Sequence, residues 1–511
     1  MRKLLGYAVI ISLIVMPLFA WVAGPTTLAS EVAVASKVIP AEDQFFIRGP
    51  TVNFVTNHSA MIFWRTNETT DATVRYGLNE SVMESETNST LDTDHRITLE
   101  SLEIDTKYWY QVVSNGTESE IYHFLTAPAD GAPFKMIVYG DTRPGTRDEP
   151  IPEITHQLAE LVAAEEPHLI LMPGDFLYEV PTDHELALEK WAEVTNITDM
   201  LGHYAPVYTV LGNHDEGQEG PRILEYYLDA FELPAEPRTY YSFDYAGVHF
   251  VSLDTEETDY WGRFVGEQYD WLIDDLTNDD SPLKFVMLHR PFYPVFHIDN
   301  GVDTVKSERD ALQQFFEEQN VTAVFNAHDH VFIRITVNGV VHITTGGAGA
   351  PLYSTWWKEA YHHYTRVHVS PNHVSFEAIK VNSEVEERYD LPYTGHIEIT
   401  LRAFPNASVK QPGSMPEILY SEPPLQTYYS WDSASNSTTL TGLPEGPGYH
   451  TLDVYAQGSD GVWAHEQYMF RAPGTTTISP PPPLDPTLPL LIIGAVGIVV
   501  VVVVIALKRK S

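Results

Sequence analysis

Short runs of alternating apolar and polar residues fill the chain between residues 41 and 127. The run AMIFWRT places Ile62 and Trp64 on one face of an extended strand, and KYWYQVV does the same with Tyr108 and Tyr110. A period of two, with turn residues between the runs, is typical of strands that bury one face. The pattern predicts a β-sandwich over residues 41–127.

The pattern changes after the segment TAPADGAP. Between residues 131 and 390, apolar runs without alternation, such as FKMIVYGD and HLILMPGD, are separated by stretches with helical spacing, such as SERDALQQFFEEQ. Strands that are apolar on both faces belong to sheets covered by other layers, and the helices between them supply that cover. Residues 131–390 are therefore expected to form an α/β domain.

Short strands return between residues 392 and 473. The run YHTLDVYAQGSDGVWAHEQYMFR predicts a hairpin with Leu452 and Val454 on one face and a turn at Asp460-Gly461. We expect a second, immunoglobulin-like β-sandwich here. Residues 474–487 are rich in proline and threonine, which predicts an extended stalk.

Both ends of the chain carry long apolar runs. Arg2 and Lys3 precede the first run, which predicts a secretory signal peptide over residues 1–29, with an uncleaved anchor as the alternative. The second run, residues 488–507, has about 20 residues, enough to span a bilayer at 1.5 Å per residue, although a buried core helix is the alternative. The basic residues in 508–511 predict a cytoplasmic end.

The charge balance limits the partners of this protein. Lys and Arg number 30 and Asp and Glu 70, which gives a net charge of −40. Such a surface disfavours nucleic acid as a structural partner, because binding its phosphates requires a cationic face. A site for phosphate would need its own positive potential, and bound metal ions could supply it. The chain has no cysteine, so disulfides do not stabilise it.

Sequons for N-linked glycosylation recur along the chain. With the apolar ends they predict a single-pass protein of the cell membrane, anchored at its C-terminus, with an extracellular catalytic domain and N-linked glycans. The sequon asparagines are Asn57, Asn67, Asn79, Asn88, Asn115, Asn196, Asn320, Asn406 and Asn436.

Polar residues that can bind metal ions follow the buried strands of the central domain. In open α/β sheets, ligands bind beyond the carboxyl ends of the strands. Each residue alone is more often a turn or packing residue, but packing alone does not account for such residues at five strand ends. Carboxylate, amide and imidazole groups suit hard and borderline ions. The residues are Asp141; Asp175 and Tyr178; Asn213, His214 and Asp215; His289; and His328 and His330.

The order GD…GDxxY…GNHD…H…HxH resembles the calcineurin-like metallophosphoesterases. Its GDxxY motif resembles the purple acid phosphatase branch, in which the tyrosine ligates a ferric ion. LEIDTKYWYQV resembles a fibronectin-type-III domain, and a domain of that kind precedes the catalytic domain in this branch. The resemblance covers roughly residues 45–390. It implies a four-layer catalytic domain, with two sheets sandwiched between helices.

The resemblance implies a binuclear metal centre, with Fe(III) beside Zn, Fe or Mn. A shared carboxylate would hold the ions ~3.5–4 Å apart, where they clamp the phosphoryl oxygens and lower the pKa of a water for in-line attack. The alternative is two divalent ions, with Tyr178 as a bystander. The first ion would bind Asp141, Asp175, Tyr178 and His330, and the second Asp175, Asn213, His289 and His328.

Further residues are expected to face the substrate. His214 would contact phosphate or protonate the leaving group, with Asp215 orienting it; the alternative is that His214 only packs the turn. Arg143, in GDTR, would clamp phosphate through its planar fork, with a surface ion pair as the alternative. By the same resemblance His297 would also face the substrate. The glycine-rich TTGGAGAPL (residues 344–352) predicts a loop that lies close to the site.

The sequence therefore predicts an acid phosphatase-like hydrolase of phosphomonoesters at the cell surface. One alternative keeps the site but makes the protein a phosphodiesterase or nucleotidase with two divalent metals. Another is a non-catalytic surface binding protein built on the two β-sandwiches. The intact set of ligands argues against the last, because a relic site would have lost at least one.

Overall fold

The computed structural model describes most of the chain between residues 45 and 472. The predicted signal peptide, stalk, membrane helix and basic tail lie outside the described residues, and so does His297. All helices and strands belong to one compact unit that begins at Phe46. The described ranges are 45–217, 222–234, 238–257, 266–296, 306–353, 360–391, 397–402, 413–432, 434–446 and 448–472.

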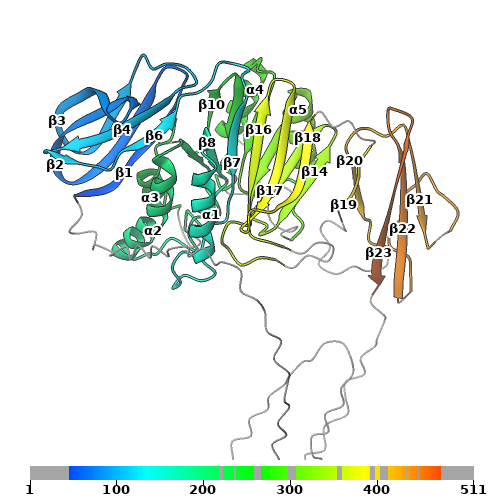
Figure 1. The fold of residues 1–511 in the computed structure, drawn as a ribbon. Helices are drawn as coiled ribbons and strands as arrows, with labels where there is room; N and C mark the ends of the chain where they lie inside the picture. Colours follow the sequence, from blue (N-terminus) through cyan, green and yellow to red (C-terminus); the bar gives the residue numbers. More distant parts are fainter. Residues whose placement is uncertain are drawn as a thin grey trace, which may run out of the picture. The chain divides into compact units, whose positions relative to one another are not determined.

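Six strands form the N-terminal domain (Figure 1). The long second strand serves both layers, because its first half pairs with the first strand and its second half pairs with the fourth. Trp64, Tyr110 and Phe124 are fully buried between the layers, which confirms the predicted β-sandwich. The strands are β1 (Phe46–Asn53), β2 (Ala60–Asn79), β3 (Val82–Leu99), β4 (Lys107–Ser114), β5 (Thr117–Glu118) and β6 (Tyr122–Leu125).

Two six-stranded sheets form the central domain. The first has the order β18-β17-β16-β7-β8-β9, and β7, β8 and β9 are parallel. Its strands are β7 (Phe134–Val138), β8 (Leu169–Met172), β9 (Val207–Thr209), β16 (His363–Ser370), β17 (His373–Lys380) and β18 (Val385–Leu391). The second has the order β10-β11-β12-β13-β15-β14, with β11, β12, β13 and β15 parallel. Its strands are β10 (Tyr241–Tyr245), β11 (Val248–Ser252), β12 (Lys284–Met287), β13 (Ala323–Asn326), β14 (Phe332–Val337) and β15 (Val340–Thr345).

Alternate residues of the central strands face different layers, which shows how the domain is built. In β12, Phe285 and Met287 belong to the core that both sheets share, whereas Val286 packs with Leu272 and Phe316 of the covering helices. Strands buried on both faces need no polar alternation, as the sequence pattern predicted. The helices are α1 (Glu153–Ala164), α2 (His184–Gly202), α3 (Glu225–Ala230), α4 (Glu267–Asn278) and α5 (Lys306–Glu318).

Two small sheets follow the central domain. One pairs β19 (Ile399–Arg402) with β20 (Glu417–Tyr420), and the other joins β21 (Gln426–Trp431), β22 (Gly448–Gln457) and β23 (Trp463–Ala472). They share an apolar core in which Leu452, Val454 and Ala456 are fully buried. These three residues lie on the face that the hairpin pattern indicated.

The β19–β20 pair also contacts the central domain. Backbone hydrogen bonds run from Asn338 N to Tyr420 O and from Gly339 N to Ser421 O, at 3.2 and 2.8 Å. Leu419 belongs to the core that α4 and α5 cover. The predicted boundary near residue 391 therefore does not separate two independent packing units.

No helix within the described ranges is both long and apolar enough to cross a bilayer. The predicted membrane helix, residues 488–507, lies outside those ranges and stays a prediction.

Candidate metal centre

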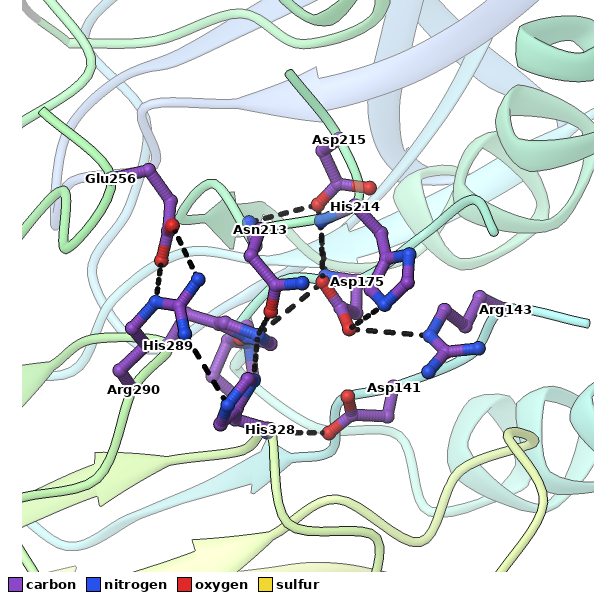
Figure 2. A network of polar contacts seen from close by, with 12 residues as sticks. Asp141, Arg143, Asp175, Asn213, His214, Asp215, Glu256, His289, Arg290 and His328 are labelled. Carbon is purple, nitrogen blue, oxygen red and sulfur yellow. Dashed lines mark hydrogen bonds and ion pairs between the residues drawn. The ribbon is translucent and has the colours of Figure 1, made fainter. Parts of the chain in front are cut away.

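The polar residues that follow the buried strands come together beyond the carboxyl ends of both sheets (Figure 2). Asp141 follows β7, Asp175 follows β8, and Asn213 follows β9 of the first sheet. His289 follows β12 and His328 follows β13 of the second sheet. Parallel strands bring their carboxyl ends to the same edge, so residues far apart in sequence become neighbours.

Two groups of ligand atoms lie close enough to bind metal ions. Asp175, His289 and His328 form one, Asp141, Asp175 and His330 form the other, and in each the atoms lie within 4.8 Å of one another. All five side chains are buried. Asp175 belongs to both groups, as expected for a carboxylate that bridges two ions.

Main-chain carbonyls orient two of the imidazoles. His289 Nδ1 lies 2.8 Å from Pro173 O, and His330 Nδ1 lies 2.7 Å from Pro351 O. A carbonyl only accepts hydrogen bonds, so each Nδ1 carries the proton and each Nε2 can bind a metal ion. His289 Nε2 lies 3.0 Å from Asn213 Oδ1, which brings the amide oxygen into the same group.

The loops that carry the ligands have unusual backbone conformations. Asp141, Asp175 and His328 have φ values of 57°, 59° and 68°, in the left-handed region that residues other than glycine rarely adopt. Gly346, in the predicted glycine-rich loop, packs so closely that a Cβ atom there would lie 2.5 Å from Asp141 Oδ2. The surrounding structure thus holds these loops in strained conformations, as is common at functional sites.

The two carboxylates at the centre have opposite electrostatic environments. Burial and the neighbouring Asp175 carboxylate raise the pKa of Asp141 well above its usual value. Burial also opposes ionisation of Asp175, but His289, His214 and Arg143 together lower its pKa below the usual value. Asp141 Oδ1 is buried without a hydrogen-bond partner among the described residues. An unpaired buried oxygen is costly, and a bound cation would satisfy it.

Arg143 lies among the candidate ligands. Its Nε donates to Asp175 Oδ2 at 3.2 Å, and its Nη2 lies 3.3 Å from His330 Nε2. Its guanidinium lies 5.5 Å from the centroid of the Tyr178 ring. The residue is buried, so the alternative of a surface ion pair does not hold.

His214 lies beside the same carboxylate. Its Nδ1 hydrogen-bonds to Tyr178 O, and its Nε2 lies 3.9 Å from Asp175 Oδ2. Its ring centroid lies 5.5 Å from that of Tyr178, so Tyr178 lies close to both His214 and Arg143. The structure places Tyr178 next to the candidate ligands; ligation through its hydroxyl stays a prediction.

Asp215 has a different position from the one expected. It accepts hydrogen bonds from the backbone N–H groups of Asp175, Phe176, Leu177 and Gly212, at 2.8–3.2 Å. We expected it to orient His214, but these hydrogen bonds instead join the loop after β8 to the loop after β9. The aspartate thus stabilises the two segments that carry Asp175 and Asn213.

Sequence reasoning missed two groups around the centre. Glu256 forms a two-pronged ion pair with the fully buried Arg290, and Arg290 Nη1 lies 3.4 Å from His328 Nε2 (Figure 2). Asp329 accepts hydrogen bonds from the backbone of the segment that follows His289. The only sequence signal was position, because Arg290 and Asp329 each adjoin a candidate ligand.

Comparison with known families agrees with this geometry. Residues 134–332 match the calcineurin-like phosphoesterase family, and residues 48–126 match the purple acid phosphatase N-terminal domain. The first match contains the candidate ligands from Asp141 to His330, and the second coincides with the N-terminal β-sandwich. The likeness to fibronectin type III stays a prediction.

The curated relatives are named as acid phosphatases. Purple acid phosphatase 22 of Arabidopsis thaliana is 28% identical over 276 residues, which cover 50% of this chain and 58% of that protein. Acid phosphatase type 7 of Danio rerio is 25% identical over 349 residues, or 57% of this chain and 76% of that protein. The chain thus spans less than two thirds of the length of the Arabidopsis relative.

Solved structures show the same fold. A purple acid phosphatase from yellow lupin (Lupinus luteus) superposes with a TM-score of 0.55 at 18% identity, over 67% of this chain and 74% of that one. A structure of PhoD superposes with a TM-score of 0.52 at 12% identity, over 86% and 94%. By the family matches, the chain carries a calcineurin-like phosphoesterase domain at residues 134–332, preceded by a purple acid phosphatase N-terminal domain at residues 48–126.

Proposed function

We propose that this protein hydrolyses phosphomonoesters with a binuclear metal centre. The observation that carries the proposal is the pair of ligand groups that share Asp175. A carboxylate common to two sets of ligands would hold two ions at the ~3.5–4 Å separation that two-metal phosphoryl chemistry uses. The names of the curated relatives agree with this activity.

The residues fit two metal ions. Carboxylate, imidazole and amide donors suit hard and borderline cations, and Asp141 Oδ1 has no hydrogen-bond partner among the described residues, so it is available to a cation. We propose Fe(III) beside Zn, Fe or Mn, with Tyr178 as a ligand of the ferric ion. Such ions would polarise the phosphoryl group and provide a water acidic enough to attack it.

Two side chains of the protein would act on the substrate. Arg143 contacts Asp175 Oδ2 and His330 Nε2, atoms that a bound metal ion would use, so it would have to leave them when an ion binds. Its planar fork then matches the oxygens of a phosphoryl group. His214 is held through Nδ1, which directs Nε2 toward the carboxylate shared by both groups. From there it would contact the phosphoryl group or the leaving oxygen.

The same proposal places the catalytic domain outside the cell, anchored by residues 488–507. Its support is the sequence of the two chain ends, together with the positions of the sequons. Eight of the nine sequon asparagines lie in the described ranges, and seven of these are exposed, as glycan attachment requires. Asn57 is half-buried.

Hydrolysis assays on the purified, metal-loaded protein test the activity. We expect turnover of 4-nitrophenyl phosphate, loss of both metal binding and turnover in Asp175→Ala, and slower turnover with intact metals in His214→Ala. If the wild type hydrolyses only bis(4-nitrophenyl) phosphate, the phosphodiesterase alternative holds instead. If it binds two metals and hydrolyses neither ester, the proposed activity is wrong.

The visible spectrum tests the proposed ferric ligand. A tyrosinate bound to Fe(III) gives a purple charge-transfer band, which Tyr178→Phe should abolish while leaving His330 and the other ligands in place. Two bound metals with no colour in either protein would favour a divalent centre, with Tyr178 in a packing role.

A further inference from the structure

The segment that follows His289 reaches the candidate ligand His330 through two aromatic side chains. In this segment, Phe296 is 40% exposed, and its ring centroid lies 4.8 Å from that of Tyr353. The Tyr353 ring in turn stacks on His330, with centroids 4.2 Å apart and planes at 18°. Phe296 and Tyr353 thus form an aromatic wall beside a candidate metal ligand.

Asp329 holds this segment from the side of the metal centre. Its Oδ2 accepts hydrogen bonds from Val295 N at 2.6 Å and from Phe296 N at 2.9 Å. Asp329 is fully buried and lies between the candidate ligands His328 and His330. The position of Phe296 is therefore tied to the loop that carries these two histidines.

The β19–β20 pair holds the segment from the other side. Arg402, the last residue of β19, donates from Nε to Pro294 O at 3.3 Å. Glu417, the first residue of β20, accepts from Arg402 Nη1 at 3.2 Å and from Arg309 Nη2 at 2.8 Å. The ring of Tyr293 lies 5.8 Å from the Arg402 guanidinium and 4.9 Å from that of Arg309.

The burial of these charges indicates a specific role. The side chains of Arg309 and Arg402 are each only 2% exposed. Burying two guanidinium groups is unfavourable unless their geometry is well satisfied, and apolar residues would join the strands to the domain at least as stably. A second ion pair, Arg334–Glu398, also joins the β19 region to the central domain, but about a fifth of each side chain is exposed.

We propose that the β19–β20 pair shapes the substrate site without touching the substrate. Arg402 and Glu417 are positioning residues: they hold Tyr293 and Pro294 so that Phe296, together with Tyr353, presents an apolar wall to the leaving group. The favoured substrates are then phosphomonoesters whose leaving group is aromatic or otherwise apolar. This substrate preference rests on the proposed function, whereas the positioning itself does not.

Hydrogen exchange on the full chain tests the positioning without any need for activity. In Arg402→Met, the amides of Phe292, Tyr293, Val295 and Phe296 should exchange about ten-fold faster, because the anchor of this segment is lost. Glu398→Gln is the matched control, since it breaks the other ion pair to the same region and should leave these amides unchanged. If Arg402→Met does not fold, hydrogen exchange is measured on Arg402→Lys instead, which keeps the positive charge. Unchanged exchange in the folded Arg402 variant, or equal acceleration in the control, would overturn the proposal.

Steady-state kinetics test the substrate preference. Phe296→Ala and Arg402→Met should each raise KM for phenyl phosphate about five-fold, the size of one aromatic contact. KM for glycerol 2-phosphate should change less than about two-fold, because no stacked contact is lost there. Phe296→Tyr keeps an aromatic ring, so its KM for phenyl phosphate should equal the wild-type value. An equal rise for both esters would refute the aromatic wall. A wild type that hydrolyses neither ester would refute the proposed function, while the exchange result would still stand.

Discussion

Replacing Asp215 by asparagine tests whether this residue joins two loops or orients His214. Its Oδ2 accepts from Asp175 N and Gly212 N, and its Oδ1 from Phe176 N and Leu177 N. An amide keeps one oxygen, so two of the four buried N–H groups lose their acceptor. At about 1–3 kcal/mol for each unsatisfied donor, the variant should lose about 2–6 kcal/mol of unfolding free energy. Metal affinity should fall as well, since the loops of Asp175 and Asn213 separate.

Urea unfolding of the metal-free protein, followed by fluorescence, measures this loss. His214→Asn is the control, because it changes the neighbouring residue without touching these four hydrogen bonds. The reasoning is refuted if Asp215→Asn changes the unfolding free energy by less than about 0.5 kcal/mol, the scatter of an ordinary surface change. A reduced turnover at unchanged stability would support the original hypothesis that Asp215 orients His214.

Two further predictions concern the surroundings of the centre, and a third concerns His249 near the start of β11. Glu256→Gln removes the ion pair of the buried Arg290 and should cost about 3–5 kcal/mol in urea unfolding; a loss below 1 kcal/mol would contradict a tightly coupled pair. Gly346→Ala puts a Cβ atom against Asp141. This variant should lose about 1–3 kcal/mol of unfolding free energy and should bind less metal, which elemental analysis measures. An equally stable variant with its full metal content would contradict the close packing. Two carboxylate hydrogen bonds outweigh burial and raise the pKa of His249 to about 9, so its stabilisation is complete below pH 6.5 and is lost as the pH rises through 9. One of its hydrogen-bond partners, Asp244, is exposed, so His249→Gln should remove only about 1–2 kcal/mol at pH 6, and nothing at pH 10, in unfolding curves at both pH values.

The sequence predicted which candidate ligands come together because strand ends are readable from one chain. The apolar runs before Asp141, Asp175 and His289 become parallel strands, and parallel strands bring the residues after them to one edge. The direction of a side chain is not readable in this way. Asp215 adjoins His214 in sequence, but the turn points its carboxylate at the backbone of another loop.

Contacts between residues far apart in the chain could not be predicted from the sequence either. Glu256 and Arg290 are 34 residues apart, and Arg402 and Pro294 are 108 apart. Each pair depends on how two segments pack, and no local pattern records that. The boundary predicted near residue 391 failed to anticipate the contact of Arg402 for the same reason: a change in strand pattern marks where one sheet ends, not what the next strands touch.

Metal content tests the central claim most directly. We expect two metal ions per chain by elemental analysis of the purified protein. Asp175→Asn should lose both, because this carboxylate belongs to both ligand groups, whereas His330→Ala should lose mainly one. A wild type saturated by a single ion, or an Asp175→Asn variant that retains two, would contradict a binuclear centre bridged by Asp175.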